Sequence, residues 1–309
     1  MDKKYFVLAF YCFTDLKEPH QEIAEQLAFL EERDAKARIY ISEEGINGQM
    51  SAAEEDARAY MAWMHSRPPF ENLHFKIHEW HENVFPRLII RYRRQLVAID
   101  DPWDIEETGI HVEPEDWAQM IDQEKPPLLI DVRNDYEWKI GHFEGAETPA
   151  CKTFREFRSY AQELRDKIPT DEPIMMCCTG GIRCEVYSAY LKRMGFEKVY
   201  QLKGGIINYG QKMGSKHWKG KLFVFDDRMS VPISNETPEI IAECFHCKTA
   251  TDDYYNCANM DCNFLFLCCQ ACLEKLHGCC CQECTEGARV RPLEQQNPHK
   301  PFRRKAQLA

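Results

Sequence analysis

The clearest chemical signal in this chain lies at residues 178–183, where an apolar run ends in Cys-Thr-Gly-Gly-Ile-Arg. Glycines let backbone N–H groups turn toward one point, and the helical pattern that follows adds partial positive charge there. A thiolate at that point is stabilised, so we interpret Cys178 as a reactive nucleophile. The alternative, a buried cysteine at a strand end, is disfavoured by the glycine pair and by Arg183.

The elements around this loop predict a parallel sheet. Apolar strands are expected over 128–133, 174–177 and 199–202, alternating with helices over 154–168 and 185–194. Such alternation is typical of a parallel sheet covered on both faces, whose site lies in loops at the carboxyl ends of the strands. Cys178 lies in such a loop.

The first hundred residues predict a separate domain. Strands are expected over 5–14, 37–42, 74–80 and 88–99, and helices over 19–33 and 52–66. This order indicates a ferredoxin-like α/β sandwich. Residues 43–48, Glu-Glu-Gly-Ile-Asn-Gly, close the strand over 37–42. Within them, Gly-Ile-Asn-Gly at 45–48 is interpreted as a tight turn, because Asn and Gly tolerate left-handed backbone conformations.

The 309 residues exceed what a single core usually serves, so we divide the chain into parts. Residues 1–100 form the first domain, 101–123 a proline-containing linker with a short helix, and 124–220 the second α/β domain. Residues 221–290 hold a following segment and a cysteine-rich region. Residues 291–309 form a basic tail, with Lys300, Arg303, Arg304 and Lys305, that we expect to be a flexible end.

Charge and hydropathy restrict the partners. The net charge of −11 disfavours an overall basic nucleic-acid binder but allows a local basic patch, for which the candidates are Arg87, Arg91, Arg93 and Arg94. No apolar run reaches membrane-spanning length, and residues 5–11 are interpreted as a strand rather than a signal peptide. We expect a cytoplasmic protein with neither a membrane nor DNA as partner.

Eleven of the sixteen cysteines follow Glu243. Cytosolic thiols stay reduced, so this local excess indicates metal binding rather than disulfides. Paired thiolates at short spacing suit tetrahedral zinc, in one or two structural sites. The expected ligands are Cys244, Cys247, Cys257, Cys262, Cys269, Cys272, Cys280 and Cys284. The choice among Cys279, Cys280 and Cys281 stays open, and an iron–sulfur cluster is the alternative.

Four signatures occur in the order found in rhodanese domains, which the second domain therefore resembles. They are Asp-Val-Arg at 131–133, Gly-His-Phe-Glu-Gly-Ala at 141–146, the loop at 178–183 and Leu-Lys-Gly-Gly-Ile at 202–206. Ordered matches are far more specific than any single motif. The resemblance implies that Cys178 carries a persulfide or acts as the nucleophile, and that Asp131 and Arg133 are structural. His142 is also expected to be structural.

Loop length separates this family from the Cys-x5-Arg phosphatases, which share the fold. Cys178 to Arg183 is the shorter Cys-x4-Arg loop. Counting from Cys177 gives Cys-x5-Arg, but Met176 and Cys184 stand where the phosphatases usually have His and Ser or Thr. We reject the phosphatase interpretation.

Nearly the whole chain resembles a narrower family, the bacterial rhodanese-containing tRNA uridine hydroxylases. The matching motifs are Glu-Gly-Ile-Asn-Gly at 44–48, Thr-Phe-Arg-Glu-Phe at 153–157, the stretch 178–185 and Phe-Val-Phe-Asp-Asp-Arg at 223–228. The resemblance implies 5-hydroxylation of the wobble uridine, position 34, in the anticodon loop of tRNA. Molecular oxygen is the implied co-substrate, and the electron donor is not identified. A base in a single-stranded loop enters a pocket at low cost.

This chemistry assigns expected roles to the loop. Cys178 adds to carbon 6 of uracil, or carries an oxidised or persulfidated sulfur, and the supporting residues are Thr179, Gly180, Gly181, Arg183 and Cys184. Cys184 is interpreted as a resolving thiol or as a small residue that fills the first helical turn. Asn47 and Arg155 are possible RNA contacts, with a turn and an ion pair as the respective alternatives.

Two other functions stay open at this point. One is a persulfide-carrying sulfurtransferase, which needs no tRNA. The other is a non-catalytic module that binds tRNA or protein through the rhodanese scaffold. The intact loop at Cys178 disfavours the second.

Overall fold

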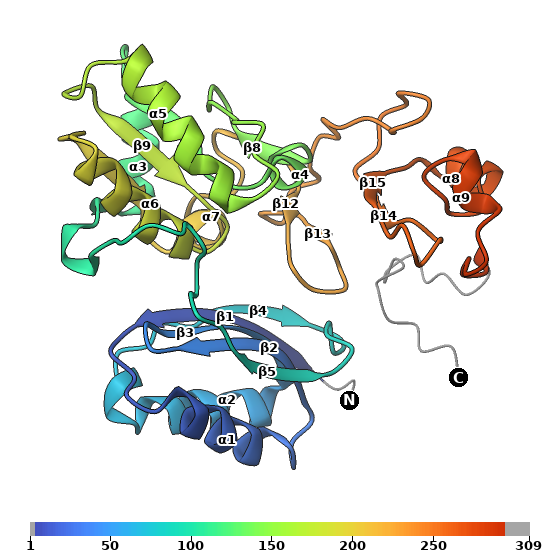
Figure 1. Cartoon of the computed structure of the whole chain (residues 1–309), viewed down its shortest axis with the longest axis horizontal. Helices are drawn as coiled ribbons and strands as arrows, with labels where there is room; N and C mark the ends of the chain where they lie inside the picture. The colour runs from blue at the N-terminus through green and yellow to red at the C-terminus, as the bar shows by residue number, and fades with distance from the viewer. Residues whose placement is uncertain (1–3, 294–309) are drawn as a thin grey trace.

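The structure of the protein, a computed structural model, describes residues 4–293. The predicted basic tail around Lys300 to Lys305 lies outside the described residues. Figure 1 shows an N-terminal domain below, a second α/β domain above it, and a small cysteine-rich region to one side. Within the described residues, no helix is both long and apolar enough to cross a membrane.

The N-terminal domain confirms the ferredoxin-like prediction. Its elements are β1 (Tyr5–Phe13), α1 (Pro19–Leu30), β2 (Ala35–Ser42), β3 (Gly45–Ala53), α2 (Glu54–His65), a 3-10 turn (Pro68–Phe70), β4 (Lys76–Trp80) and β5 (Leu88–Tyr92). The sheet order is β4-β1-β3-β2-β5, the split βαβ arrangement with an added edge strand. Both helices cover one face of the sheet, and the other face turns toward the second domain (Figure 1).

The prediction of a tight turn at residues 45–48 was wrong. Only Glu43 and Glu44 form the turn, and Gly45–Ala53 is β3, which pairs with β1 on one side and β2 on the other. Gly45 has φ +128°, and a Cβ there would stand 2.0 Å from the carbonyl oxygen of Cys12. The glycine therefore allows a close strand approach. Asn47, two residues on, lines a cavity between the domains.

The second domain is built on a parallel sheet of order β6-β10-β9-β7. Its elements are β6 (Ile110–Val112), α3 (Pro114–Ile121), β7 (Leu128–Asp131), α4 (Asp135–Trp138), β8 (Gly141–Phe143), α5 (Phe157–Lys167), β9 (Ile174–Cys177), α6 (Ile182–Arg193), β10 (Val199–Leu202) and α7 (Gly205–Met213). Two buried clusters, one on each face of this sheet, hold Ile130 and Met176 on one side and Leu129 and Met175 on the other. The prediction of a parallel sheet covered on both faces is confirmed.

The predicted linker 101–123 is shorter than expected. Residues 110–121 form β6 and α3, and β6 pairs with β10 as the edge strand of the parallel sheet. Ile110-His111-Val112 is too short for its periodicity to be recognised, and its pairing partner lies about ninety residues away, so tertiary context decides its conformation.

The rest of the chain consists of short elements. They are the 3-10 turns Ile105–Glu107 and Phe154–Glu156, β11 (Trp218–Gly220), β12 (Leu222–Phe223), β13 (Ser230–Val231), β14 (Tyr254–Asn256), β15 (Leu265–Leu267), α8 (Gln270–Lys275) and α9 (Gln282–Thr285). β11 pairs with β8, and β12 with β13. The β14–β15 hairpin forms the base of the cysteine-rich region.

An ion pair between Asp131 and Arg133 lies wholly inside the second domain, with both side chains 0% exposed. The Arg133 Nε donates to Asp131 Oδ1 at 2.8 Å, and Arg133 Nη2 donates to the carbonyl oxygen of Gly141 at 2.6 Å. The pair thus ties the end of β7 to β8, in agreement with the structural role that the rhodanese resemblance implies.

We expect Arg133→Ala to lower the free energy of unfolding by about 3–5 kcal/mol, because it leaves a buried carboxylate without its partner. The matched change Arg58→Ala removes an exposed ion pair to Glu54 within one helix and should cost less than about 0.5 kcal/mol. Urea unfolding of both variants measures the difference. Equal losses would show that the buried pair has no special part in the fold.

Candidate functional site

Cys178 follows β9 directly, and the loop that begins with it runs into the N-terminus of α6. The side chain is 1% exposed, and the backbone N–H of Gly181 donates to its Sγ at 3.1 Å. Gly181 has φ +104°, and a Cβ on it would stand 2.8 Å from the hydroxyl of Tyr11. The positive φ favours glycine at this turn, and the absence of a Cβ leaves room for the Tyr11 hydroxyl of the N-terminal domain.

The surroundings of Cys178 favour its thiolate. Burial by itself raises the pKa of this thiol. The hydrogen bond with the Cys184 thiol, the charge of Arg183, and the backbone N–H groups of Cys184 and Gly181 outweigh it and lower the pKa to about 5. Cys178 is consequently a thiolate at neutral pH, which is the reactive form.

Arg183 is held in place by a carboxylate that the sequence analysis did not identify. Its Nη2 donates to Glu137 Oε2 at 2.8 Å and to Thr179 Oγ1 at 3.3 Å. Glu137 is 0% exposed, and its Oε1 accepts the backbone N–H of Asn134 at 3.0 Å, as part of a capping box on α4. The Asn-x-x-Glu spacing at 134–137 was the available signal. It marks a helix start, but not the arginine that the glutamate meets.

The two cysteines beside Cys178 stay protonated. Burial raises the pKa of Cys177 well above its ordinary range. Burial and the neighbouring Cys178 sulfur do the same for Cys184. Cys184 lies next to Cys178, as a resolving thiol must, and it is also wholly buried in the first turn of α6, as a filling residue would be. Both interpretations of Cys184 therefore remain predictions.

The N-terminal domain closes over the loop. Tyr11, on β1, donates its hydroxyl to Glu185 Oε1 at 3.0 Å. Glu185 on α6 also meets His111 Nε2 at 2.9 Å and accepts from Gln201 Nε2 at 2.9 Å. The Tyr11–Glu185 hydrogen bond joins the two domains beside Cys178, and the other two contacts hold Glu185 in place within the second domain. Tyr11 and Glu185 are two further site residues that sequence reasoning missed, because their partners lie far away in the chain.

A cavity of about 370 Å³ lies between the domains, with Cys178 in its wall. The loop contributes Thr179, Gly180 and Arg183. Aromatic residues of both domains also line it: Tyr11, Tyr40, Phe154 and Phe225. We call this space the first cavity. Its volume falls in the range of small-molecule sites.

Lys76, the first residue of β4, also lines the first cavity and is only 5% exposed. Its ammonium group lies 5.0 Å from the centre of the Tyr11 ring. Among the residues that the structure describes, no carboxylate forms an ion pair with it. Burial lowers the pKa of Lys76 to about 8, and the negative charges of Cys178 and Glu185 limit the shift. The sequence offered no signal for this lysine, because a lysine on a short strand usually faces solvent.

The two possible RNA contacts fall at different depths. Asn47 lines the first cavity opposite the loop. Arg155 forms an ion pair with Asp100 and is 59% exposed. It lines an adjoining open depression of about 1000 Å³ together with Arg93 and Arg94. The ion-pair alternative for Arg155 is thus present, at the rim of the site. His142 bonds to the carbonyl oxygen of Trp138 and does not line the first cavity.

The structure gathers all eight expected metal ligands into two groups of four. Cys244, Cys247, Cys269 and Cys272 form one group, and Cys257, Cys262, Cys280 and Cys284 form the other. The sulfur atoms in each group lie within 4.8 Å of one another. Four thiolates at this spacing fit a tetrahedral ion. The groups interleave along the chain, so each joins two segments across the β14–β15 hairpin. Cys279 and Cys281 belong to neither group.

Comparison with known proteins assigns each part of the chain. Residues 5–96 match a family described as an acylphosphatase-like domain, residues 113–212 the rhodanese-like domain, and residues 219–285 a domain described as rhodanase C-terminal. A protein of Protochlamydia amoebophila named tRNA uridine(34) hydroxylase is 57% identical over 98% of this chain and 95% of its own length. The chain belongs to the tRNA uridine(34) hydroxylase family.

Two further members have similar coverage. The tRNA uridine(34) hydroxylase of Chlamydia pneumoniae is 51% identical over 98% of this chain and 94% of its own length. That of Chlamydia muridarum is 52% identical over 99% of this chain and 94% of its own length. The similarity thus covers the cysteine-rich region as well as the two α/β domains, and the resemblance inferred from the motifs is confirmed.

The stabilised thiolate predicts a distinct reactivity. Alkylation of Cys178 by iodoacetamide, followed by mass spectrometry of its peptide, should rise with an inflection near pH 5 and stay level to pH 8. In Arg183→Met the thiolate loses its positive neighbour, so the inflection moves toward the ordinary thiol value and the rate at pH 6 falls about tenfold or more. Arg183→Lys keeps a positive charge, so it should keep part of the alkylation rate at pH 6 that Arg183→Met loses.

Cys151 is the internal control for this measurement. Burial raises the pKa of Cys151 to about 11, so it should react only in alkaline solution. An inflection of Cys178 near pH 9 in the unmodified protein would contradict the geometry described here.

Proposed function

We propose that this protein hydroxylates carbon 5 of uridine 34 in tRNA, with molecular oxygen as the oxidant and Cys178 as the nucleophile. The observation that carries the proposal is the stabilised thiolate of Cys178 in the wall of a cavity built by both domains. The substrate is taken from the names of relatives whose similarity covers 98% of this chain.

The thiolate supplies the activation that uracil requires. When the Cys178 sulfur bonds to carbon 6, the electron pair of the 5,6 double bond moves toward carbon 5 and the carbon 4 carbonyl. Carbon 5 is then enolate-like and able to attack an oxygen donor. The developing charge lies beside Arg183 and the N–H groups of the loop, which stabilise it. One oxygen atom enters the base at carbon 5, and the other leaves as water with two electrons and two protons from a reductant. Loss of the proton on carbon 5 then restores the 5,6 double bond, the bond between sulfur and carbon 6 breaks, and Cys178 leaves as the thiolate.

The first cavity suits an extruded base. Tyr40, Phe154 and Phe225 offer faces on which a base can stack, as is common for bases taken from single-stranded loops. The amide of Asn47 can pair with the polar edge of uracil, which has both donor and acceptor groups. Cys178 and Asn47 come from different domains, so the cavity exists only when the domains are together.

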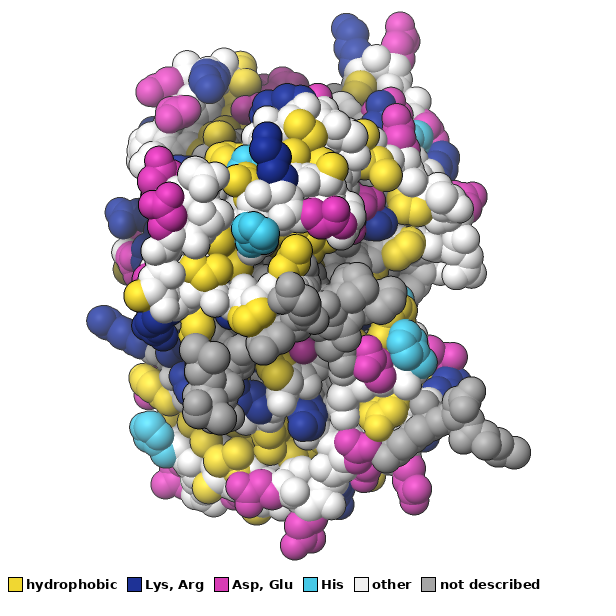
Figure 2. All heavy atoms as spheres, turned by 90° about the vertical axis from the view of Figure 1, so that its right-hand side faces the viewer, with side chains coloured by type: hydrophobic (Ala, Val, Ile, Leu, Met, Phe, Trp, Pro, Cys, Tyr) yellow, Lys and Arg dark blue, Asp and Glu magenta, His cyan; other side chains and the backbone are white. Residues whose placement is uncertain are grey.

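The anticodon loop is the part of tRNA that we place at this site. Acidic and basic side chains are interspersed over the face shown in Figure 2, in keeping with the net charge of −11. Phosphate contacts therefore have to be local. Arg93, Arg94 and Arg155 line the open depression beside the first cavity and can meet the loop backbone. We infer a cytoplasmic location, where tRNA is found and thiols stay reduced.

We propose that the two cysteine groups hold structural zinc. Each group offers four thiolates and no open position, which is the pattern of a structural site. The apolar core of this region is small and consists largely of the cysteines themselves, so the ions would supply much of its stability. An iron–sulfur cluster also takes four thiolates, and visible absorbance distinguishes the two.

Cys178→Ser should abolish 5-hydroxyuridine in tRNA from cells that carry only this variant, since a hydroxyl is a far weaker nucleophile at neutral pH. Nucleoside mass spectrometry measures the product. Cys151→Ser, at a buried thiol outside the cavity, should leave it unchanged. Full hydroxylation by Cys178→Ser would overturn the mechanism. Transfer of sulfur from thiosulfate to cyanide without any effect on tRNA would favour the sulfurtransferase alternative.

Two zinc equivalents per chain are expected from elemental analysis of the colourless purified protein. Cys247→Ser and Cys262→Ser each remove one ligand from a different group, so each variant should retain about one equivalent. Cys281→Ser, outside both groups, should retain both. If the unmodified protein instead contains iron and absorbs visible light, the cysteine groups hold an iron–sulfur cluster and not zinc.

A further inference from the structure

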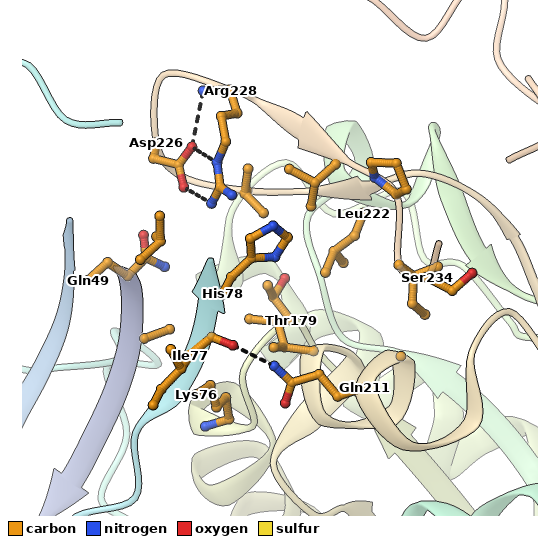
Figure 3. Close-up of a pocket in the computed structure, with 18 of the residues that line it drawn as sticks. Gln49, Lys76, Ile77, His78, Thr179, Gln211, Leu222, Asp226, Arg228 and Ser234 are labelled. Atoms are coloured by element: carbon orange, nitrogen blue, oxygen red, sulfur yellow. Dashed lines mark hydrogen bonds and ion pairs between the residues drawn. The ribbon is translucent and has the colours of Figure 1, made fainter. Parts of the chain in front are cut away.

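A second cavity, of about 420 Å³, lies beside the first. It is bounded by β1, β4, α7 and the segment 222–235, as Figure 3 shows. The two cavities share five wall residues: Ala9, Gln49, Lys76, Thr179 and Ile207. The two cavities therefore adjoin, so a strand with one nucleotide in the first cavity can place a neighbouring nucleotide in the second. The reaction derived above makes no use of this space.

Two cationic side chains of the second cavity have unused hydrogen-bond donors. Arg228 donates to Asp226 through Nε at 2.8 Å and through Nη2 at 2.6 Å. Its Nη1 is buried and meets no acceptor in the part of the chain that the structure describes. The ammonium of Lys76 likewise has no ion pair there. A buried donor without a partner is costly, so Arg228 Nη1 and the unpaired charge of Lys76 lead us to expect a bound acceptor that carries negative charge.

The remaining polar groups suit a nucleobase. Figure 3 places the ring of His78 between Arg228 and Lys76, with Gln49 and Gln211 on either side. Burial, followed by the charge of Arg228, lowers the pKa of His78, so its ring is neutral at pH 7 and can stack or hydrogen-bond. Gln211 donates through Nε2 to the carbonyl oxygen of Ile77 at 2.8 Å, which fixes the orientation of its amide.

We propose that the second cavity binds the nucleotide adjacent to uridine 34 in the same strand. Lys76, on the wall shared by the two cavities, contacts the phosphate that links the two nucleotides, and Arg228 contacts the phosphate beyond. The proposal rests on the proposed function only in placing uridine 34 in the first cavity. Lys76 is thus a substrate-binding residue, charged at neutral pH, and it sets the register of the strand against Cys178.

A nucleotide fits these observations better than a small anion. A single anion would satisfy one of the two cations, and it would not need the amides and the histidine ring. The volume and the mixture of apolar and polar walls are those of an organic ligand site. Because the second cavity adjoins the first, the nucleotide that it binds is the neighbour of uridine 34.

The test measures binding, so it does not depend on turnover. Anticodon stem-loop RNA is prepared with a neutral methylphosphonate at either phosphate that flanks uridine 34. Lys76→Met should weaken binding of the unmodified RNA about 10- to 100-fold, the usual loss of a hydrogen bond to a charged group. One of the two methylphosphonates should weaken RNA binding to the unmodified protein by a similar factor. The same methylphosphonate should not weaken binding to Lys76→Met any further. That position also identifies which neighbour occupies the second cavity.

A second comparison tests the base. An abasic residue at the identified neighbour should weaken binding about tenfold in the unmodified protein and much less in His78→Ala. Lys17→Met, at an exposed lysine, should leave every affinity unchanged. The unfolding midpoint shows whether each variant is folded.

The proposal is overturned if each methylphosphonate weakens binding to Lys76→Met by the same factor as binding to the unmodified protein. Lys76 would then contact neither phosphate. An abasic neighbour that binds as tightly as the normal RNA would also overturn it, in favour of a small anion. Coupled losses in a protein that lacks hydroxylase activity would leave this binding site standing while the proposed function fails.

Discussion

Cys178 is 1% exposed and its thiol is ionised at neutral pH, and an anion out of water is costly unless donors and positive charge surround it. The loop provides the N–H of Gly181 and the guanidinium of Arg183. Arg183 is nearly buried as well, so it needs a carboxylate, which Glu137 supplies. Glu137 in turn accepts the N–H of Asn134. Each charged group of the site is therefore stabilised by the next: the positive charge of Arg183 stabilises the Cys178 thiolate, and Glu137 stabilises Arg183.

The same constraint explains why the site needs two domains. A rhodanese loop alone would leave Cys178 open on one side. Here Tyr11 reaches across to Glu185, and its hydroxyl would stand 2.8 Å from a Cβ at position 181, where φ is +104° and glycine is favoured. The N-terminal sheet brings Asn47 and Lys76 to the cavity on its face away from the helices. Nucleophile and recognition groups therefore come from different domains, and their separation is set by the contacts between them.

The cysteine-rich region supports the site indirectly. Tyr254 on β14 donates to the carbonyl oxygen of Tyr136 at 2.6 Å, and Lys221 pairs with Asp252 at 3.0 Å. Tyr136 lies on α4, next to Glu137, the residue that holds Arg183. Metal ions in the two cysteine groups would rigidify the hairpin that makes this contact. A region distant from Cys178 in the sequence thus packs against the helix that orients the loop.

The features that the sequence determined by itself are those that depend on the spacing of residues close together in the chain. The Cys-x4-Arg loop, the cysteine pairs and the alternation of strands and helices each depend on residues a few positions apart, and the structure places the eight expected cysteines in two groups. Tertiary structure decided the rest. Residues 45–48 resemble a turn because their glycines serve close strand approach, and Ile110–Val112 becomes a strand only beside β10. Glu137, Tyr11, Glu185 and Lys76 have ordinary local sequences. Their roles follow from contacts between distant elements, because burial and the charge across the domain boundary exist only once the chain is folded.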